Sequence, residues 1–204
     1  MYFNKTPEIL KSVYRNVVWN IPNDEHKVYL TFDDGPTPGI TDKTLGLLKE
    51  KGVIATFFCL GNQVDANRAL FDRLKAEGHQ IGNHAYSHLK GWSTDNDHYL
   101  EVVEKGRQTT ASNVFRPPYG KIKRAQLKEV QKENTVVMWT VLPGDFDDKV
   151  SVEQCIKNAV DNVASGDIIV LHDNATCGNK MLAALPQIID GLHAKGFVFD
   201  TIPD

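Results

Sequence analysis

Cysteine is scarce in this sequence, which contains three such residues in 204. Cys59, Cys155 and Cys177 are an odd number, and no two of them form a Cys-x-x-Cys pair. This pattern argues against a disulfide framework and against a zinc ion held by cysteines. We expect Cys59, which lies inside an apolar run, to be a small core residue, as free cysteines usually are.

Long hydrophobic runs are also absent. No apolar stretch approaches the roughly 18 to 20 residues that a membrane helix needs. Polar residues interrupt every apolar pair in the first segment, MYFNKTPEILKSVYRNVVWN, so it does not have the pattern of a signal peptide. The sequence therefore predicts no membrane segment and a cytoplasmic protein.

There is no excess of basic charge either, because the net charge is −3 at pH 7. Nothing in this balance indicates a nucleic-acid partner. The length and the hydrophobic fraction of 41% suit one globular domain over residues 1–204, which we expect to be a monomer. Residues 1–25 are predicted to be a helix and a lead-in that pack on this domain. Thr6 would be the N-cap and Pro7 the first helical residue, followed by an apolar stripe of Leu10, Val13, Tyr14, Val17 and Val18.

Short β-branched or aromatic runs alternate with segments of helical apolar spacing along the rest of the chain. The predicted strands are Val28–Phe32, Ile54–Leu60, Gln80–Asn83, Val114–Arg116, Val136–Val141, Ile168–Leu171 and Phe197–Thr201. The predicted helices are Asp42–Lys51, Val64–Glu77, Asp97–Ser112, Lys121–Asn134, Val152–Ala164 and Lys180–Lys195. This alternation indicates an α/β fold with a parallel sheet of about seven strands.

Polar motifs follow five of these strands: DDGP, NHAYSH, RPPYG, GDF and LHD. In a (β/α) barrel the loops at the carboxyl ends of the strands meet on one face and build the site there. An open sheet brings together only the few loops at its switch point. The five motifs therefore favour a barrel over an open sheet.

Two histidines four residues apart, His84 and His88, lie in NHAYSH, where they can share one metal ion. The same spacing also occurs by chance on exposed helices. Asp33 and Asp34 end a predicted buried strand, and a divalent cation would relieve the repulsion between two such neighbouring carboxylates. Alternatively, the two aspartates cap a turn with Gly35 and Pro36. Two histidines and one aspartate would leave coordination positions open, as catalytic metal sites do.

Two further motifs hold side chains suited to catalysis. In FRPPYG, the two prolines restrict the backbone around Arg116 and the Tyr119 amide, although such a run is also a common turn. His172 ends a predicted buried strand and could donate a proton to a leaving group, or could simply lie at the rim of the fold. His26, His79, His98 and His193 are interpreted as surface residues.

Together these motifs resemble the polysaccharide deacetylases, the carbohydrate esterase family 4 domain found in chitin, peptidoglycan and nodulation-type deacetylases. TFDDGP corresponds to the first family motif, HAYSH to the second, RPPYG to the third, GDF in part to the fourth and LHD to the fifth. They occur in the family's order between residues 31 and 173. The resemblance implies a distorted, incomplete (β/α) barrel.

The resemblance also implies a role for each matching residue. Asp34, His84 and His88 would bind a divalent metal ion, zinc first, with cobalt, nickel or manganese as alternatives. Asp33 would be the general base and Arg116 would orient it, while the Tyr119 backbone amide would help to hold the oxyanion. His172 would protonate the leaving amine, tuned by Asp145. Leu171, Phe146, Pro117 and Tyr119 would contact the substrate, with Leu171 lining the pocket for the acetyl methyl group.

Three features depart from the family pattern. Ala85 stands where relatives usually carry Ser or Thr, and loss of such a partner could cost about 10- to 100-fold in metal affinity or activity. In the fourth motif, Leu142 replaces an acid and Phe146 replaces a tryptophan. Many relatives also carry a signal peptide or a membrane anchor, and the sequence predicts neither here.

The leading functional hypothesis is a metal-dependent deacetylase of N-acetylated glycans, such as chitooligosaccharides or peptidoglycan N-acetylglucosamine. An O-acetyl (acetylxylan) esterase would use the same catalytic set. Two alternative hypotheses come from other functional classes: a non-catalytic carbohydrate-binding protein with this fold, and a non-haem iron oxygenase. Trp92 and Tyr99 would either line a sugar groove or belong to the core.

Overall fold

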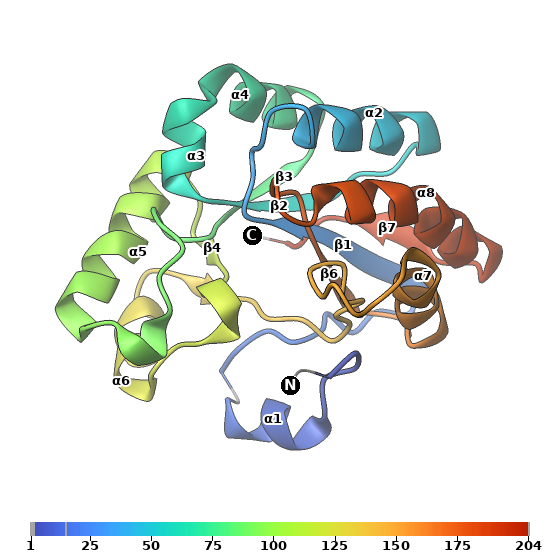
Figure 1. The fold of residues 1–204 in the computed structure, drawn as a ribbon. Coiled ribbons are helices and arrows are strands. Elements are labelled where there is room, and N and C mark those ends of the chain that lie inside the picture. Colours follow the sequence, from blue (N-terminus) through green and yellow to red (C-terminus); the bar gives the residue numbers. More distant parts are fainter. Residues whose placement is uncertain (1–2, 15, 204) are drawn as a thin grey trace.

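The computed structural model describes residues 3–14 and 16–203, and its centre is a curled sheet of parallel strands. The strands are β1 (Lys27–Asp33), β2 (Thr56–Cys59), β3 (Gln80–Asn83), β4 (Val114–Phe115), β5 (Thr135–Val136), β6 (Ile168–His172) and β7 (Val198–Asp200). Their order is β5-β4-β3-β2-β1-β6, and β7 pairs with the start of β1. This is the predicted distorted, incomplete (β/α) barrel, and each predicted strand is present in part (Figure 1).

The fifth predicted strand, Val136–Val141, is mostly irregular, and this explains why the barrel stays incomplete. Only its first residue belongs to β5, while Val137 bridges to Val18 and Val141 bridges to Ile169 of β6. The carbonyls of Val137 and Met138 accept hydrogen bonds from the buried Arg116 side chain. Because these carbonyls bond to a guanidinium, the segment crosses from β4 to β6 without a continuous ladder.

Helices cover the outside of the sheet, with α5 and α6 beside β3 and β4, and α2, α7 and α8 beside β1 and β6 (Figure 1). Their bounds are α1 (Glu8–Val13), α2 (Thr41–Lys51), α3 (Gly61–Ala66), α4 (Arg68–Ala76), α5 (Asn96–Thr110), α6 (Arg124–Val130), α7 (Val152–Asp161) and α8 (Gly178–Ala194). The predicted helix Val64–Glu77 is two helices, because Asn67 has a non-helical backbone. Short 3-10 turns lie at Gly91–Ser93 and Pro118–Gly120.

The N-terminal helix is shorter than predicted. It ends at Val13, so Val17 and Val18 lie beyond it, and Leu10 is exposed. Thr6 is not the N-cap: its hydroxyl donates to the carbonyl of Trp139 at 2.8 Å, and Pro7 takes the cap position. Contacts between this segment and the barrel include the Thr6 hydrogen bond, the buried Val17 and Tyr14, which packs against the same cluster as Val17.

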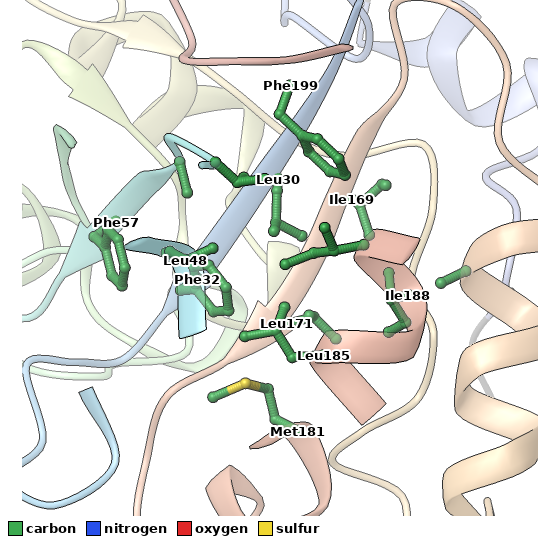
Figure 2. Packing of buried hydrophobic residues seen from close by; sticks show 14 of the residues in the cluster. Leu30, Phe32, Leu48, Phe57, Ile169, Leu171, Met181, Leu185, Ile188 and Phe199 are labelled. Atoms are coloured by element: carbon green, nitrogen blue, oxygen red, sulfur yellow. The ribbon is translucent and has the colours of Figure 1, made fainter. Parts of the chain in front are cut away.

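Alternation along β1 and β6 separates the two sides of the sheet. Leu30 and Phe32 of β1 and Ile169 and Leu171 of β6 pack outward against α8, in the largest core cluster (Figure 2). The alternate residues, which include Asp33 and His172 at the ends of the two strands, point to the inside of the barrel, because successive side chains of a strand face opposite sides. The polar ends of both strands thus reach one inner face.

None of the helices in residues 3–14 and 16–203 is long and apolar enough to cross a membrane. The cytoplasmic location stays a prediction from the N-terminal sequence.

Candidate active site

A cavity of about 620 Å³ opens at the carboxyl ends of the strands. The loops after β1, β3, β4 and β6 line it, together with the segment that follows β5. Predicted site residues on its wall are Asp33, Asp34, His84, His88, Tyr119, Phe146 and His172. The motifs expected to meet on one face of the barrel therefore do so.

Asp34, His84 and His88 form a group whose ligand atoms lie close enough to share a metal ion. Asp34 Oδ1 is 3.5 Å from His84 Nε2 and 3.2 Å from His88 Nε2. This oxygen is buried and has no hydrogen-bond donor among the described residues. A buried carboxylate oxygen without a donor is costly, and a cation between it and the two imidazoles would satisfy it. The three residues therefore fit a divalent metal.

The ligand group is held in place by neighbouring polar contacts. His84 Nδ1 lies 2.8 Å from the carbonyl of Arg116, which leaves Nε2 free to face the other ligands. Asn174 Nδ2 donates to Asp34 Oδ2 at 2.7 Å, so the second carboxylate oxygen is fixed. Sequence reasoning missed Asn174, although it follows directly after the LHD motif.

The charges of this group suit metal binding. Burial raises the pKa of Asp34, but the neighbouring His84 and the charges of the surrounding histidines outweigh it and hold the pKa well below its usual range. Burial and the charge of His84 lower the pKa of His88. An ionised carboxylate and a neutral imidazole are the forms that coordinate a cation.

Asp33 lies beside the ligand group and is bound to a buried arginine. Arg116 Nη1 donates to Asp33 Oδ1 at 2.7 Å and also contacts the Thr31 hydroxyl at 2.7 Å. Its guanidinium stacks 3.9 Å from the centre of the Phe58 ring. Burial lowers the pKa of Arg116 despite the opposing charge of Asp33, but an arginine remains protonated in proteins. Arg116 therefore lies behind Asp33 and orients it rather than lining the cavity.

His172 and Asp145 form a second coupled pair on the same cavity. His172 Nδ1 is 3.0 Å from Asp145 Oδ1, and the backbone N–H of His172 donates to Asp145 Oδ2 at 2.7 Å. Burial lowers the pKa of His172, but the charge of Asp145 and the hydrogen bond to it raise the pKa to about 9 overall. The imidazole is therefore protonated at neutral pH and can act as a proton donor.

Two predicted substrate contacts do not face the cavity. Leu171 is fully buried in the core cluster on the outer side of β6, where it packs with Leu185 and Phe32 (Figure 2). Its neighbour Val170 lines the cavity instead, because β6 alternates and His172 points inward. Pro117 is buried in the turn behind Tyr119 and is not part of the wall. The expectation that Leu171 lines the acetyl pocket is therefore corrected.

The remaining predicted contacts lie at the mouth of the cavity. Tyr119 is 54% exposed, has a left-handed backbone (φ 59°), and its ring centre is 4.3 Å from that of His88. Phe146 packs edge-on against His172, with ring centres 5.3 Å apart. Sequence reasoning did not assign the wall residues Trp139, Lys121, Thr176 and Cys177. None of them lies in a recognisable motif.

The loop with Ala85 is held without a hydroxyl at that position. The side chain of Asn83 accepts from the Ala85 N–H at 2.8 Å and donates to the Val103 carbonyl of α5 at 3.1 Å. Ala85 is buried with a left-handed backbone (φ 66°). Asn83 thus supplies a polar contact that steadies the histidine loop.

One histidine differs from its expected setting, and the two open alternatives for the aromatic residues are resolved. His79 is buried, not solvated: its Nδ1 accepts from the Ala55 N–H at 3.2 Å, and burial lowers its pKa. Tyr99 is fully buried in a core cluster, whereas Trp92 is 57% exposed. Of these two aromatic residues, Trp92 alone is placed where a sugar could reach it.

Comparison with known proteins agrees with this geometry. The polysaccharide deacetylase family model matches residues 20–138 of the chain, which include the first three motifs. The chain belongs to the polysaccharide deacetylase family. A peptidoglycan-N-acetylglucosamine deacetylase of Bacillus cereus is 33% identical over 196 residues, covering 92% of each chain. A chitooligosaccharide deacetylase of Azorhizobium caulinodans is 29% identical, covering 90% of this chain and 96% of its own.

A solved structure extends the likeness to three dimensions. The crystal structure of a peptidoglycan N-acetylglucosamine deacetylase in complex with 4-naphthalen-1-yl-N-oxidanyl-benzamide matches with a TM-score of 0.88 and 33% identity. The match covers 95% of this polysaccharide deacetylase chain and 94% of the other. Polysaccharide deacetylases are metal-dependent hydrolases, and this member has a group of three residues, Asp34, His84 and His88, whose ligand atoms could hold a metal ion.

Proposed function

We propose that this protein removes acetyl groups from N-acetylglucosamine residues of a glycan, by metal-assisted hydrolysis in the cavity described above. The observation that carries the proposal is that three groups of residues meet at one cavity. They are the ligand set of Asp34, His84 and His88, the Asp33–Arg116 pair, and the His172–Asp145 pair. A base and an acid that flank a metal site match hydrolysis of an amide.

In this proposal Asp33 accepts the proton of the attacking water, and Arg116 holds the carboxylate toward the cavity through its 2.7 Å bond. His172 donates a proton to the leaving amine, and Asp145 keeps the imidazole protonated and oriented. When bound, the metal ion supplies Lewis-acid activation of the water and of the acetyl carbonyl. The Tyr119 backbone N–H serves as a further donor to the developing oxyanion.

We infer that zinc is the bound metal. Two imidazole nitrogens and one carboxylate oxygen form a donor set that zinc uses in catalytic sites, with a position left open. Cobalt, nickel or manganese would accept the same ligands. Residues 1–204 are proposed to work as one catalytic domain and as a monomer.

Two lysines, Lys121 on the wall of the cavity and Lys90 beside Tyr119, favour a glycan that carries negative charge. Lys121 Nζ lies 5.4 Å from the centre of the Trp92 ring, and Lys90 Nζ lies 5.7 Å from that of Tyr119. Among the residues that the structure describes, neither forms an ion pair with a carboxylate. A carboxylate close to the sugar chain, as on the stem peptides of peptidoglycan, would pair with these cations, whereas chitooligosaccharides offer none.

Acetate release tests the proposal. The purified protein would be assayed with zinc, with cobalt and with chelator on peptidoglycan fragments, chitooligosaccharides and acetylated xylooligosaccharides. We expect chelator-sensitive release, with the highest kcat/KM on peptidoglycan fragments. Preferential release from acetylated xylan would indicate the O-acetyl esterase. No release from any substrate by protein with metal bound would overturn the proposed hydrolysis and favour a carbohydrate-binding protein.

A further inference from the structure

The side chain of Cys177 lines the catalytic cavity, yet the proposed reaction does not use it. The loop from β6 to α8 folds back on itself, because Asn174 Oδ1 accepts from the backbone N–H groups of Thr176 and Cys177. This places Cys177 Sγ 3.2 Å from Asn174 Oδ1 and 3.9 Å from the carbonyl oxygen of His172. The thiol is therefore fixed next to the His172–Asp145 pair.

Asp145, His172 and Cys177 form a second group with metal-ligand geometry. One ligand atom of each residue lies within 4.8 Å of those of the other two. The group contains a sulfur, a nitrogen and an oxygen donor, and both Cys177 and His172 border the cavity, which gives a route for an ion. Thiolate and imidazole together select zinc and softer divalent ions such as cadmium.

We propose that a second divalent cation of the zinc or cadmium type binds to Asp145, His172 and Cys177, and that its binding inhibits the enzyme. Coordination releases one proton from the Cys177 thiol and one from the His172 imidazolium, which become thiolate and neutral imidazole. The leaving amine then has no proton donor on this wall. The inhibitory part rests on the proposed function of His172, whereas the binding part does not.

This second site is expected to fill after the first. At the first site, Asp34 Oδ1 accepts no hydrogen bond from the described residues, so an entering ion has no such bond to break. At the second site, Asp145 already accepts two hydrogen bonds from His172, and both must be rearranged or shared when the ion enters. Activity should therefore rise with the first equivalent of metal and fall as the second binds.

Titration of the zinc-loaded protein with Cd²⁺ tests the binding. A sulfur-to-cadmium charge-transfer band in the ultraviolet can arise from the second group and not from the first, which has no sulfur ligand. We expect the band in the wild type and in Cys155→Ser, a control cysteine buried in α7, and its loss in Cys177→Ser. Absence of the band from the wild type, or its persistence in Cys177→Ser, would overturn the proposal.

A second measurement uses the wild type alone, so it tests the site even if Cys177→Ser does not fold. Cadmium NMR of the wild type should show a second bound ion whose shift indicates a sulfur ligand; a second signal typical of nitrogen and oxygen ligands alone would refute the site.

Acetate release measured against the concentration of free Zn²⁺ tests the inhibition, with the activity of each variant expressed relative to its own maximum. Cys177→Ser should need at least about tenfold more Zn²⁺ for half inhibition, since a lost ligand costs roughly 1.4 kcal/mol or more. A cadmium band from a protein without deacetylase activity would refute the proposed function and leave the cation site standing.

Discussion

The two adjacent aspartates at the end of β1 have separate surroundings, which explains how one strand end can hold both. Asp33 continues the inward-facing alternation of β1 and meets Arg116 inside the barrel. Asp34 has a left-handed backbone (φ 84°), which turns its carboxylate to the histidines. Each carboxylate therefore has its own positive or metal-binding partner, so the repulsion between them is reduced.

Asp33→Asn should abolish turnover and leave the metal bound. The amide cannot accept a proton, whereas the ligand group of Asp34, His84 and His88 remains complete. His84→Ala should lose both turnover and metal. Acetate release and metal content by atomic emission measure the two effects, and the exposed Asp161→Asn serves as a control. Wild-type turnover in Asp33→Asn would show that the base is another group.

Asp145→Asn should shift the pH dependence of kcat/KM. In the wild type, the limb on the alkaline side is set by loss of the His172 proton, whose pKa is raised to about 9 from an ordinary 6.5. Without the charge of Asp145 this pKa falls, so the limb should move to lower pH by about one unit or more. A pH–rate profile of both proteins measures the shift; an unchanged alkaline limb would remove His172 from the role of acid.

The same pair has a consequence for stability. Because the folded-state pKa of His172 lies above its unfolded value, the stabilisation by Asp145 is complete below about pH 6.5. It is lost as the pH rises through about 9. The free energy of unfolding, measured with urea, should therefore differ less between pH 6 and pH 10 in Asp145→Asn than in the wild type.

At the scale of elements, α5 and the histidine loop are packed in direct contact. A Cβ on Gly106 of α5 would lie 2.4 Å from Asn83 Oδ1, 2.5 Å from the Ala85 carbonyl carbon and 2.7 Å from the Tyr86 nitrogen. Two of these three atoms belong to the backbone of the loop that follows His84. The absence of a side chain at position 106 is therefore part of what positions the loop between His84 and His88.

Gly106→Ala and Gly46→Ala should change stability in opposite directions. Gly46 lies on the exposed side of α2 with open space around it, so alanine there should stabilise the fold by about 0.5 to 1 kcal/mol through helix propensity. Gly106→Ala should destabilise it by about 1 to 3 kcal/mol, because the loop must move. It should also weaken zinc binding. Urea unfolding and zinc titration measure both effects, and equal stabilisation by the two changes would contradict the contact.

At the scale of the whole molecule, the site links segments far apart in the chain. Asp34 follows β1, His84 and His88 follow β3, and Asn174 follows β6. An ion bound to the first three residues joins these loops in the folded state, and an unfolded chain does not hold them together. Metal binding should therefore stabilise the barrel as well as support the reaction.

Removal of metal should lower the melting temperature. Zinc at about 100 times its Kd adds about 2.7 kcal/mol to the free energy of unfolding when it binds the folded state alone. Thermal unfolding with zinc and with chelator should show a clear shift in the wild type and in Asp33→Asn, and almost none in His84→Ala. A shift of the same size in His84→Ala would place the stabilising ion at another site.

The sequence by itself determined the order of strands and helices, the motifs at the strand ends and the family. These depend on local patterns: apolar periodicity, Gly and Pro at turns, and short runs such as TFDDGP. The sequence also contains the pattern that excludes Leu171 from the cavity, since strand alternation puts Leu171 on the face opposite His172. Asp145, separated from His172 by more than twenty residues, was assigned through the resemblance alone.

The tertiary structure decided which side chains share the cavity. Trp139, Lys121, Asn174 and Cys177 join it through the curl of the sheet and the return of the β6–α8 loop, which no local pattern specifies. Burial likewise depends on what packs against a segment, as the covered His79 shows. The irregular path after β5 has the same origin, because its carbonyls bond to an arginine from a neighbouring strand. Contacts between residues distant in the chain are set by the packing of the whole fold, and the sequence pattern of each segment does not contain them.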